Sequence, residues 1–207
     1  MRLFAFACFG LALTVSCASQ KKLLRANPAK YTLQQKALIK EGSAQRAMKL
    51  MVITNSFDSI LLRQKSAPID IQNEKELNTY FASRLETTMT SAMGVGIAAP
   101  QVGILKQMIC VQRFDKEGFP NEIFINPVIT KYSEEKQDCR EGCLSIPGRS
   151  DTTQIRALTI ALEYQTLEGE NMHETVTGFT AVIFQHEIDH LNGILYIDHL
   201  KEEMKGK

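Results

Sequence analysis

Apolar residues recur at four-residue steps in the stretch from Ile69 to Met93, and polar residues occupy most of the positions between them. This spacing places side chains on one face of an α-helix. We predict an amphipathic helix here, whose apolar face packs against the core of a domain. The residues of that face are Leu77, Phe81, Leu85, Met89 and Met93.

Three apolar stretches with many β-branched residues follow the predicted helix, at residues 104–112, 123–132 and 157–164. Glycine and proline residues lie between and within them, and these favour turns. A second helix is predicted from about Thr177 to Asn192. This order of elements predicts a single α+β domain with mostly antiparallel sheets.

The first residues have the pattern of a secretory signal. Met1 and Arg2 precede an apolar run, residues 3–15, that is too short to span a bilayer as a helix. Small and apolar residues then lead directly to Cys17, as in a bacterial lipobox. We expect residues 1–16 to be a lipoprotein-type signal peptide and the protein to reach the bacterial cell envelope. A buried core segment and an organellar transit peptide are the alternatives.

The segment between this signal and the domain is predicted to be a tether with a short helical adaptor, residues 17–48. Its first part, 18–30, is small and basic and has no periodic apolar pattern. From Leu33 onward the apolar residues have helical spacing, which Gly42 and Ser43 interrupt. We therefore expect one or two short helices, then the compact domain over residues 49–203 and a tail over 204–207.

The composition is typical of a globular protein. The 207 residues suffice for one ordinary domain, with 44% hydrophobic residues, 23% charged residues and a formal net charge of +1. So small a net charge gives no electrostatic footprint for nucleic acid, and we expect no nucleic-acid partner. Contact with a membrane is expected only through a lipid on Cys17.

Two histidines and a glutamate stand close together in the second predicted helix, as His186, Glu187 and His190. A step of four residues returns to nearly the same side of a helix, so both imidazoles face one point. Two imidazoles suit a transition metal, and the adjacent carboxylate suits proton transfer from a water on that metal. A solvated helix face with two histidines by chance is the alternative, which the apolar flanking residues disfavour.

A catalytic metal site needs a third protein ligand and one position open for water. By composition the best candidate is a thiolate, and Cys143 lies in the glycine-containing segment from Glu141 to Ser145. Cys139 precedes it by four residues, so a local disulfide in an oxidising compartment is the alternative role for Cys143. The spacing leaves both roles open.

Glycines alternate with small apolar residues from Gly94 to Gly103. Such a segment lets another backbone or a substrate approach closely. It lacks the lysine of a phosphate-binding loop and the glycine spacing of a dinucleotide site. A tight packing loop and the edge of a substrate site therefore both remain open for it.

Three motifs occur together in the chain: G-x-G-I-A-A-x-Q from Gly94, E-G-C-L-S from Glu141 and Q-H-E-x-D-H-x-x-G from Gln185. In this order and combination they closely resemble the peptide deformylase family. The resemblance covers about residues 50 to 200, so it identifies residues 49–203 as the catalytic domain.

The resemblance implies mostly antiparallel sheets packed around a C-terminal metal-binding helix. It implies a metal-dependent hydrolase that removes the formyl group from the N-terminal formylmethionine of polypeptides and releases formate. The metal would be held by Cys143, His186 and His190, which excludes a Cys139–Cys143 disulfide in the active enzyme. The preferred metal of the family is Fe²⁺, and Zn²⁺ is a common substitute.

The resemblance also implies the roles of further residues. Glu187 would transfer the proton, while the Gln101 side-chain amide and the Leu144 backbone N–H would stabilise the developing oxyanion. The substrate would lie extended beside Gly94–Ile97 as an added strand, with its methionine in an apolar pocket. The substrate-binding residues expected are Gly94, Gly96, Ile97, Glu141, Phe179, Val182 and Ile183.

Two other functions remain open from the sequence. A zinc metalloprotease or amidase would use the same helix with its two histidines, and a non-catalytic lipoprotein would bind formyl-peptides without cleaving them. We expect a monomer. Most members of the family act in the cytoplasm or an organelle, so that location is the alternative to the cell envelope.

Overall fold

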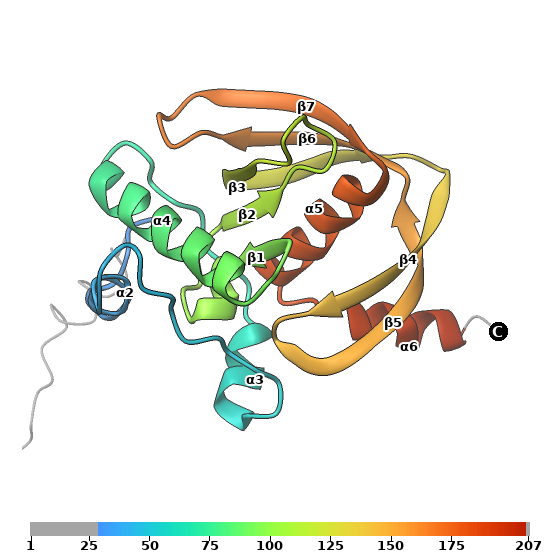
Figure 1. The fold of residues 1–207 in the computed structure, drawn as a ribbon, viewed down its shortest axis with the longest axis horizontal. Helices are drawn as coiled ribbons and strands as arrows, with labels where there is room; N and C mark the ends of the chain where they lie inside the picture. Colours follow the sequence, from blue (N-terminus) through green and yellow to red (C-terminus); the bar gives the residue numbers. More distant parts are fainter. Residues whose placement is uncertain (1–28, 206–207) are drawn as a thin grey trace, which may run out of the picture.

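The computed structural model describes residues 29–205, and the predicted signal peptide and Cys17 lie outside these residues. The described chain is an α+β domain in which one helix lies between two antiparallel sheets (Figure 1). In chain order its elements are α2 (Leu33–Ile39), α3 (Ser56–Leu62), α4 (Lys75–Ser91), β1 (Gly96–Ala98), the 3₁₀ turn η1 (Ala99–Val102), β2 (Met108–Gln112), β3 (Asn121–Tyr132), β4 (Lys136–Cys143), β5 (Ile146–Ala157), β6 (Thr159–Gln165), β7 (Asn171–Thr177), α5 (Gly178–Leu191) and α6 (Tyr196–Lys205).

The larger sheet has five strands in the order β1-β2-β3-β6-β7, and the smaller sheet is the β4–β5 ribbon. All strand pairs in both sheets are antiparallel, as predicted. Strand β1 is an edge of the larger sheet, because it pairs only with β2. Pro127 lies inside β3 at a register shift between Ile125 and Val128, where the strand tolerates a residue without an N–H.

Helix α5 is the centre of the molecule. It contacts strands of both sheets, and Figure 1 shows it between the five-stranded sheet and the β4–β5 ribbon. Nearly every residue from Thr180 to Leu191 is buried, which is the environment expected of a helix that is apolar around most of its circumference. The predicted second helix is therefore present, with bounds within one residue of those expected.

The predicted first helix begins later than its apolar pattern does, at Lys75, and it ends at Ser91. Phe81, Leu85 and Met89 are buried in the core as expected. Met93 is not part of this face, because it lies beyond the helix end with a left-handed φ of 54° and is 92% exposed. The expectation for Met93 was wrong, since the turn that ends the helix points this side chain away from the core.

The described part of the predicted tether is packed on the domain. Tyr31, Ile39 and Met48 are buried in the same core cluster as α4. The buried Arg84 of α4 donates hydrogen bonds to the carbonyl oxygens of Leu38, Ile39 and Arg46 at 2.8–3.1 Å. Residues 29–48 therefore add a structural layer over α4, which a free tether would not do.

Several elements differ from the expected ones. Two helices were not expected from the sequence, namely α3, which contains most of residues 58–63, and the short C-terminal helix α6. Strands β4, β5 and β7 have largely exposed side chains, so they lack the apolar signal of a buried strand. None of the helices within residues 29–205 has the length and apolar character needed to cross a membrane.

Candidate active site

Three potential metal ligands converge from two distant parts of the chain. Cys143 ends strand β4, and His186 and His190 lie one helical turn apart on α5. Their ligand atoms all lie within 4.8 Å of one another, and Cys143 Sγ is 3.2 Å from His190 Nε2. The pairing of β4 with β5 and the packing of α5 between the sheets thus bring the thiol to the two imidazoles.

The donor set fits a divalent transition metal. A soft thiolate and two imidazoles are typical ligands of zinc and iron, and three protein ligands leave a fourth position open. Burial, together with the nearby His186 ring, holds the pKa of His190 well below its ordinary value. His190 is therefore neutral, which is the form that binds a metal.

Glu141 orients His186 within this cluster. The Nδ1–H of His186 donates to Glu141 Oε2 at 2.7 Å, so Nε2 is the nitrogen left to face the ligand cluster. Burial alone would raise the pKa of Glu141, but hydrogen bonds from His186 and Arg156 hold it well below its usual range. The buried carboxylate is thus a permanent anion that fixes the tautomer and orientation of His186.

Glu141 also lines the cleft, and its expected contact with substrate stays a prediction beside this supporting role. Its two oxygens accept hydrogen bonds from Thr153, Arg156 and His186, and the residue is 4% exposed. The carboxylate is occupied by protein groups and has little surface left for a peptide. The motif alone did not reveal this, because Arg156 and Thr153 lie on the other strand of the ribbon.

A line of charged groups extends from Glu141 to the surface. The Arg156 guanidinium donates to both Glu141 oxygens at 2.9 Å and to Asp189 Oδ2 at 2.6 Å. His199 Nε2 lies 2.8 Å from the same Asp189 oxygen. Sequence analysis did not identify Arg156 or His199, since neither is close to the motifs along the chain.

Glu187 is buried against the edge of the larger sheet. Its Oε2 has no hydrogen-bond partner among the described residues, and burial raises its pKa to about 7. A Cβ on Gly96 would collide with Glu187 Oε1 and would lie 2.7 Å from Ile183 Cγ2. A glycine at position 96 is therefore required for the backbone of β1 to lie this close to the carboxylate.

The Gln101 side chain points its amide nitrogen toward the thiol. The Ala98 backbone N–H donates to Gln101 Oε1 at 2.8 Å, which fixes the orientation of the amide. Gln101 Nε2 then lies 3.6 Å from Cys143 Sγ and 3.3 Å from Ser145 Oγ. Gln101 is buried in η1, so this donor is held in place before any ligand arrives.

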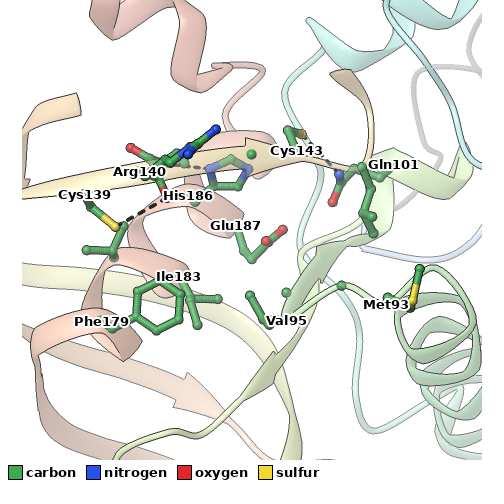
Figure 2. Close-up of a pocket in the computed structure, with 16 residues that line it drawn as sticks. Met93, Val95, Gln101, Cys139, Arg140, Cys143, Phe179, Ile183, His186 and Glu187 are labelled. Atoms are coloured by element: carbon green, nitrogen blue, oxygen red, sulfur yellow. Dashed lines mark hydrogen bonds and ion pairs between the residues drawn. The ribbon is translucent and has the colours of Figure 1, made fainter. Parts of the chain in front are cut away.

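These groups line one side of a cleft of about 350 Å³. Figure 2 shows the Glu187 carboxylate between His186 and Gln101, with Phe179, Ile183 and Val95 along the opposite side of the pocket. The cleft thus has a polar end and an apolar end. Its lining residues are Met93, Gly94, Val95, Gly96, Gln101, Cys139, Arg140, Glu141, Gly142, Cys143, Leu144, Phe179, Val182, Ile183, His186 and Glu187.

Most of the predicted substrate-binding residues line this cleft. Phe179, Val182 and Ile183 come from the first two turns of α5, and Gly94 and Gly96 come from the edge strand and the residues before it. Ile97 differs, because its side chain is fully buried in the core on the other face of β1. Its backbone groups face Cys110 of β2, by the same alternation that turns Val95 toward Gln112, so the expected contact of Ile97 with substrate stays a prediction.

The structure also answers the disulfide question. Cys139 and Cys143 lie four residues apart on the extended strand β4, although a register shift interrupts its pairing between Gly142 and Cys143. Residues at this spacing in a strand are about 13 Å apart, whereas a disulfide joins Cα atoms about 4.4–6.8 Å apart. Both thiols are free, and Cys139 lines the cleft as a further wall residue.

Comparisons with known proteins agree with this geometry. Residues 50–206 match the family model described as Polypeptide deformylase. A peptide deformylase of Caulobacter vibrioides is 38% identical over 154 residues, which are 73% of this chain and 87% of that protein. One of Brucella suis is 39% identical over 144 residues, 69% of this chain and 80% of that protein.

Solved structures give the same result. A class I type b peptide deformylase from Acinetobacter baumannii, with Met-Ala-Ser bound, superposes with a TM-score of 0.66 at 34% identity and covers 75% of this chain and 99% of that chain. A peptide deformylase from Thermotoga maritima has a TM-score of 0.65 at 34% identity, with coverage of 74% and 97%. These relatives favour deformylase activity over the protease and the non-catalytic lipoprotein considered above. The chain therefore belongs to the peptide deformylase family, the hydrolases that remove the formyl group from N-terminal formylmethionine.

Proposed function

We propose that this enzyme hydrolyses formylmethionyl peptides with a divalent metal, Fe²⁺ in the native state and Zn²⁺ as a substitute, held by Cys143, His186 and His190. The observation that carries the proposal is the convergence of these three ligand atoms beside Glu187 and Gln101. A metal held by these three residues would supply Lewis acidity, which would lower the pKa of water and polarise a carbonyl.

Glu187 is proposed to move the proton. Its unpartnered oxygen lies in the cleft next to His186, within the buried end where the scissile amide has to reach. The carboxylate takes a proton from the attacking water and delivers it to the amine that leaves with the methionine. In the free enzyme Glu187 Oε2 is available to the attacking water, because it has no hydrogen-bond partner among residues 29–205.

Gln101 and Leu144 are proposed to stabilise the oxyanion. The Gln101 amide is held by Ala98 with its N–H₂ group toward the thiol, and Leu144 follows Cys143 directly and lines the cleft. Donors that are fixed before the reaction stabilise charge without reorganisation during it. The Leu144 backbone N–H and the Gln101 amide would serve as two such donors.

The free edge of β1 is the proposed binding site of the peptide backbone. Val95 O accepts from Gln112 N at 2.9 Å, so Val95 faces β2 and the backbone groups of the next residue, Gly96, face the opposite edge. An extended substrate on that edge gains backbone hydrogen bonds that do not depend on its sequence. The Acinetobacter baumannii relative has been solved with Met-Ala-Ser bound, which supports a peptide of this kind here.

The test of this function is formate release from formyl-Met-Ala-Ser by protein lacking residues 1–16, stripped of metal and then reloaded anaerobically. We expect activity with Fe²⁺ and lower activity with Zn²⁺. We expect Glu187→Gln to lose about 10²–10⁴-fold in kcat while it binds an unchanged amount of metal. Full activity without added metal, or in Glu187→Gln, would contradict the proposed mechanism.

We further propose that the protein is a monomer anchored in the bacterial envelope by a lipid on Cys17. The support is the apolar run 3–15 followed by small residues and Cys17. Metabolic labelling with a palmitate analogue tests this proposal. Cys17→Ala should lose the label, whereas the matched control Cys8→Ala, in the same segment, should keep it. Absence of label in the natural sequence would rule out the anchor and favour the cytoplasm or an organelle.

A further inference from the structure

Positive charge is concentrated in the first third of the chain. Residues 1–69 contain 11 lysines and arginines and two acidic residues, a net charge of +9, whereas residues 70–207 contain 13 and 21, a net charge of −8. The small net charge of the whole chain therefore conceals a strong separation of charge. Such an asymmetry is typical of proteins whose basic part binds an anionic surface.

Residues 29–69, the described part of this basic region, form one flank of the molecule, which we call the basic flank. Figure 1 shows its helices α2 and α3 below α4, with β6 and β7 at the top. Its two acidic residues are Glu41 and Asp58, and Asp58 is 3% exposed with its carboxylate bonded to the Val52 N–H. Six basic residues of the flank are exposed, so its surface is positive. These are Lys30, Lys40, Arg46, Lys49, Arg63 and Lys65.

Most of this positive charge is not neutralised by neighbouring side chains. Arg63 pairs with Asp198, and the half-buried Lys36 pairs with Glu74. The other five exposed basic residues form no ion pair with an acidic side chain within residues 29–205. Because the rest of the chain is negative, the field of the molecule turns the basic flank toward an anionic surface.

The basic flank also exposes large apolar side chains. Phe57 and Ile60 lie one turn apart on α3 and are 70% and 65% exposed, and Leu33 on α2 is 87% exposed. Of the large apolar side chains in the described part of the chain, only Met93 is as exposed as these three. Apolar residues next to basic ones are typical of helices that lie in the headgroup region of a bilayer. A nucleic acid would engage the charges but would leave Leu33 and Ile60 in water, so the combination favours a bilayer.

Helix α3 is held on the catalytic domain in one orientation. Asn55 Oδ1 accepts from the Phe57 N–H at 3.0 Å, which caps the helix. Leu62 on its inner face is fully buried, and the Ile53 N–H just before the helix donates to Ser145 O at 3.0 Å. The outward face of α3 is therefore formed before any partner arrives, which lowers the entropy cost of binding.

The basic flank follows directly on the segment that carries Cys17. Ala29, the first described residue, comes twelve residues after Cys17, and a fully extended chain of this length reaches about 40 Å. Three more basic residues lie in this segment, namely Lys21, Lys22 and Arg25. A lipid on Cys17 would therefore keep the basic flank within reach of a bilayer.

The catalytic cleft stays accessible when this flank is covered. The described residues that line the cleft lie between positions 93 and 187, so none of them belongs to the basic flank. We propose that the basic flank binds the anionic surface of a phospholipid bilayer, with Phe57 and Ile60 inserted among the headgroups. This contact goes beyond the deformylase function, and it adds electrostatic and apolar binding that does not require a lipid on Cys17.

Sedimentation with phospholipid vesicles tests the proposal. The protein used lacks residues 1–16 and carries Cys17→Ala, so it cannot be lipidated. It is mixed with vesicles of phosphatidylglycerol or of phosphatidylcholine. We expect binding to the anionic vesicles that weakens as salt is added, and binding to the zwitterionic vesicles that is weaker by about tenfold or more.

Charge reversal on the flank locates the contact. Lys49→Glu combined with Lys65→Glu should lower the partition coefficient on phosphatidylglycerol by about 20-fold or more, because each basic residue near an anionic surface contributes about fivefold. Lys131→Glu combined with Lys136→Glu is the matched control. Both of these lysines are exposed and lie on β3 and β4, and the change in net charge is the same. The control should bind about as well as the natural sequence.

The apolar insertion has its own readout, because the chain contains no tryptophan. Phe57→Trp places a single fluorophore on α3, and Tyr132→Trp places one on β3, where the side chain is also exposed (52%). With phosphatidylglycerol vesicles, the emission of Phe57→Trp should shift to shorter wavelength and should be quenched by brominated acyl chains. Tyr132→Trp should show neither change.

The outcomes decide the proposal without reference to catalysis. Salt-sensitive binding to phosphatidylglycerol that is lost in Lys49→Glu with Lys65→Glu, and kept in the control, supports the contact. Equal binding to both lipids, unchanged binding of that double variant, or emission of Phe57→Trp that vesicles leave unchanged overturns it. A duplex RNA that binds where phosphatidylglycerol vesicles do not would assign the flank to nucleic acid and also overturn the proposal. None of these readouts depends on formate release, so the deformylase function is tested separately.

Discussion

At the scale of single residues, the site depends on side chains that neighbouring residues hold in place by hydrogen bonds. Ala98 orients the Gln101 amide and Glu141 orients His186, each through a buried hydrogen bond shorter than 3 Å. Gly96 lets the edge strand approach Glu187. Such fixed groups contribute most where charge develops, because they need not reorganise.

Gln101→Leu tests this view at one residue. The substitution keeps the approximate size of the side chain and removes the donor aimed at the thiol. We expect kcat to fall by about 10²–10³-fold, the usual loss for one oxyanion donor, while the metal content stays the same. The exposed Gln64→Leu, whose side chain bonds only to Ile60 O, is the control. Equal kcat values for both variants would exclude Gln101 from stabilising the transition state.

At the scale of elements, ionic and apolar contacts join segments that are far apart in sequence. Arg156 of β5 bridges Glu141 of β4 and Asp189 of α5, and it is 3% exposed. A second connection is apolar, since Ile39 of α2 is fully buried against the α4 cluster. Arg156 and Ile39 both lie outside the three motifs. The first joins β5 to β4 and α5, which carry the metal ligands, and the second joins α2 to α4.

Arg156→Met should destabilise the protein strongly. The change leaves the buried Glu141 carboxylate without its guanidinium partner, and removal of one member of a buried ion pair costs about 3–5 kcal/mol. Denaturant unfolding measures the free energy, and metal binding should weaken in parallel because His186 loses its fixed orientation. Arg149→Met is the control, since its pair with Asp151 is on the surface, and a similar loss in this control would contradict a special role for the buried bridge.

Ile39→Ala tests whether residues 29–48 belong to the folded domain. Truncation of a fully buried isoleucine typically costs about 2–5 kcal/mol. We therefore expect a clear fall in the free energy of unfolding. Leu33→Ala on the same helix is the control, because Leu33 is 87% exposed and such changes stay within about 0.5 kcal/mol. If Ile39→Ala were as mild as the control, the segment would be a tether in solution.

At the scale of the whole molecule, acidic groups paired with arginine link stability to pH. Hydrogen bonds from Arg113 hold the pKa of Asp115 below its usual value. Asp198, bonded to Arg63, also has a lowered pKa: burial opposes the shift, and the hydrogen bonds from Arg63 and the Leu195 N–H, together with the nearby positive charges, outweigh it. The first pair lies within the turn after β2, and the second joins the residue after α3 to α6, so acid weakens one contact within a turn and one between two elements.

The sign of the pH effect follows from the direction of these shifts. A carboxyl group with a lowered folded-state pKa contributes its full stabilisation above its unfolded pKa of about 3.9, and this is lost as the pH falls through the folded value. We expect the denaturant concentration at the midpoint of unfolding to decrease as the pH is lowered below about 4. Asp115→Asn should be less stable than the natural sequence at pH 6, and its free energy of unfolding should decrease less on acidification. If the free energy of unfolding of this variant fell between pH 4 and pH 3 as steeply as that of the natural sequence, Asp115 would be excluded from the effect.

Much of the fold could be predicted from local patterns. The apolar period of α4 and α5 and the β-rich stretches of β2, β3 and β6 are strong signals, because these elements bury one or more faces. The β4–β5 ribbon has no such signal, since most of its side chains face solvent. Its two strands are matched by their backbone pairing with each other. The prediction was wrong at Met93, because an apolar residue can continue the four-residue spacing of a helix that has already ended.

The sequence by itself determined the chemistry available to this protein: two imidazoles and a carboxylate on one helix, a thiol in a glycine-containing segment and an amide after a glycine-rich strand. Those assignments depend on local spacing, which the chain carries in its order of residues. Only the tertiary structure decided that Glu141 supports His186, that Arg156 joins Glu141 to Asp189, and that Phe114 lies beside Phe179. These contacts join residues from different elements, and no local pattern encodes which surfaces meet when the elements pack.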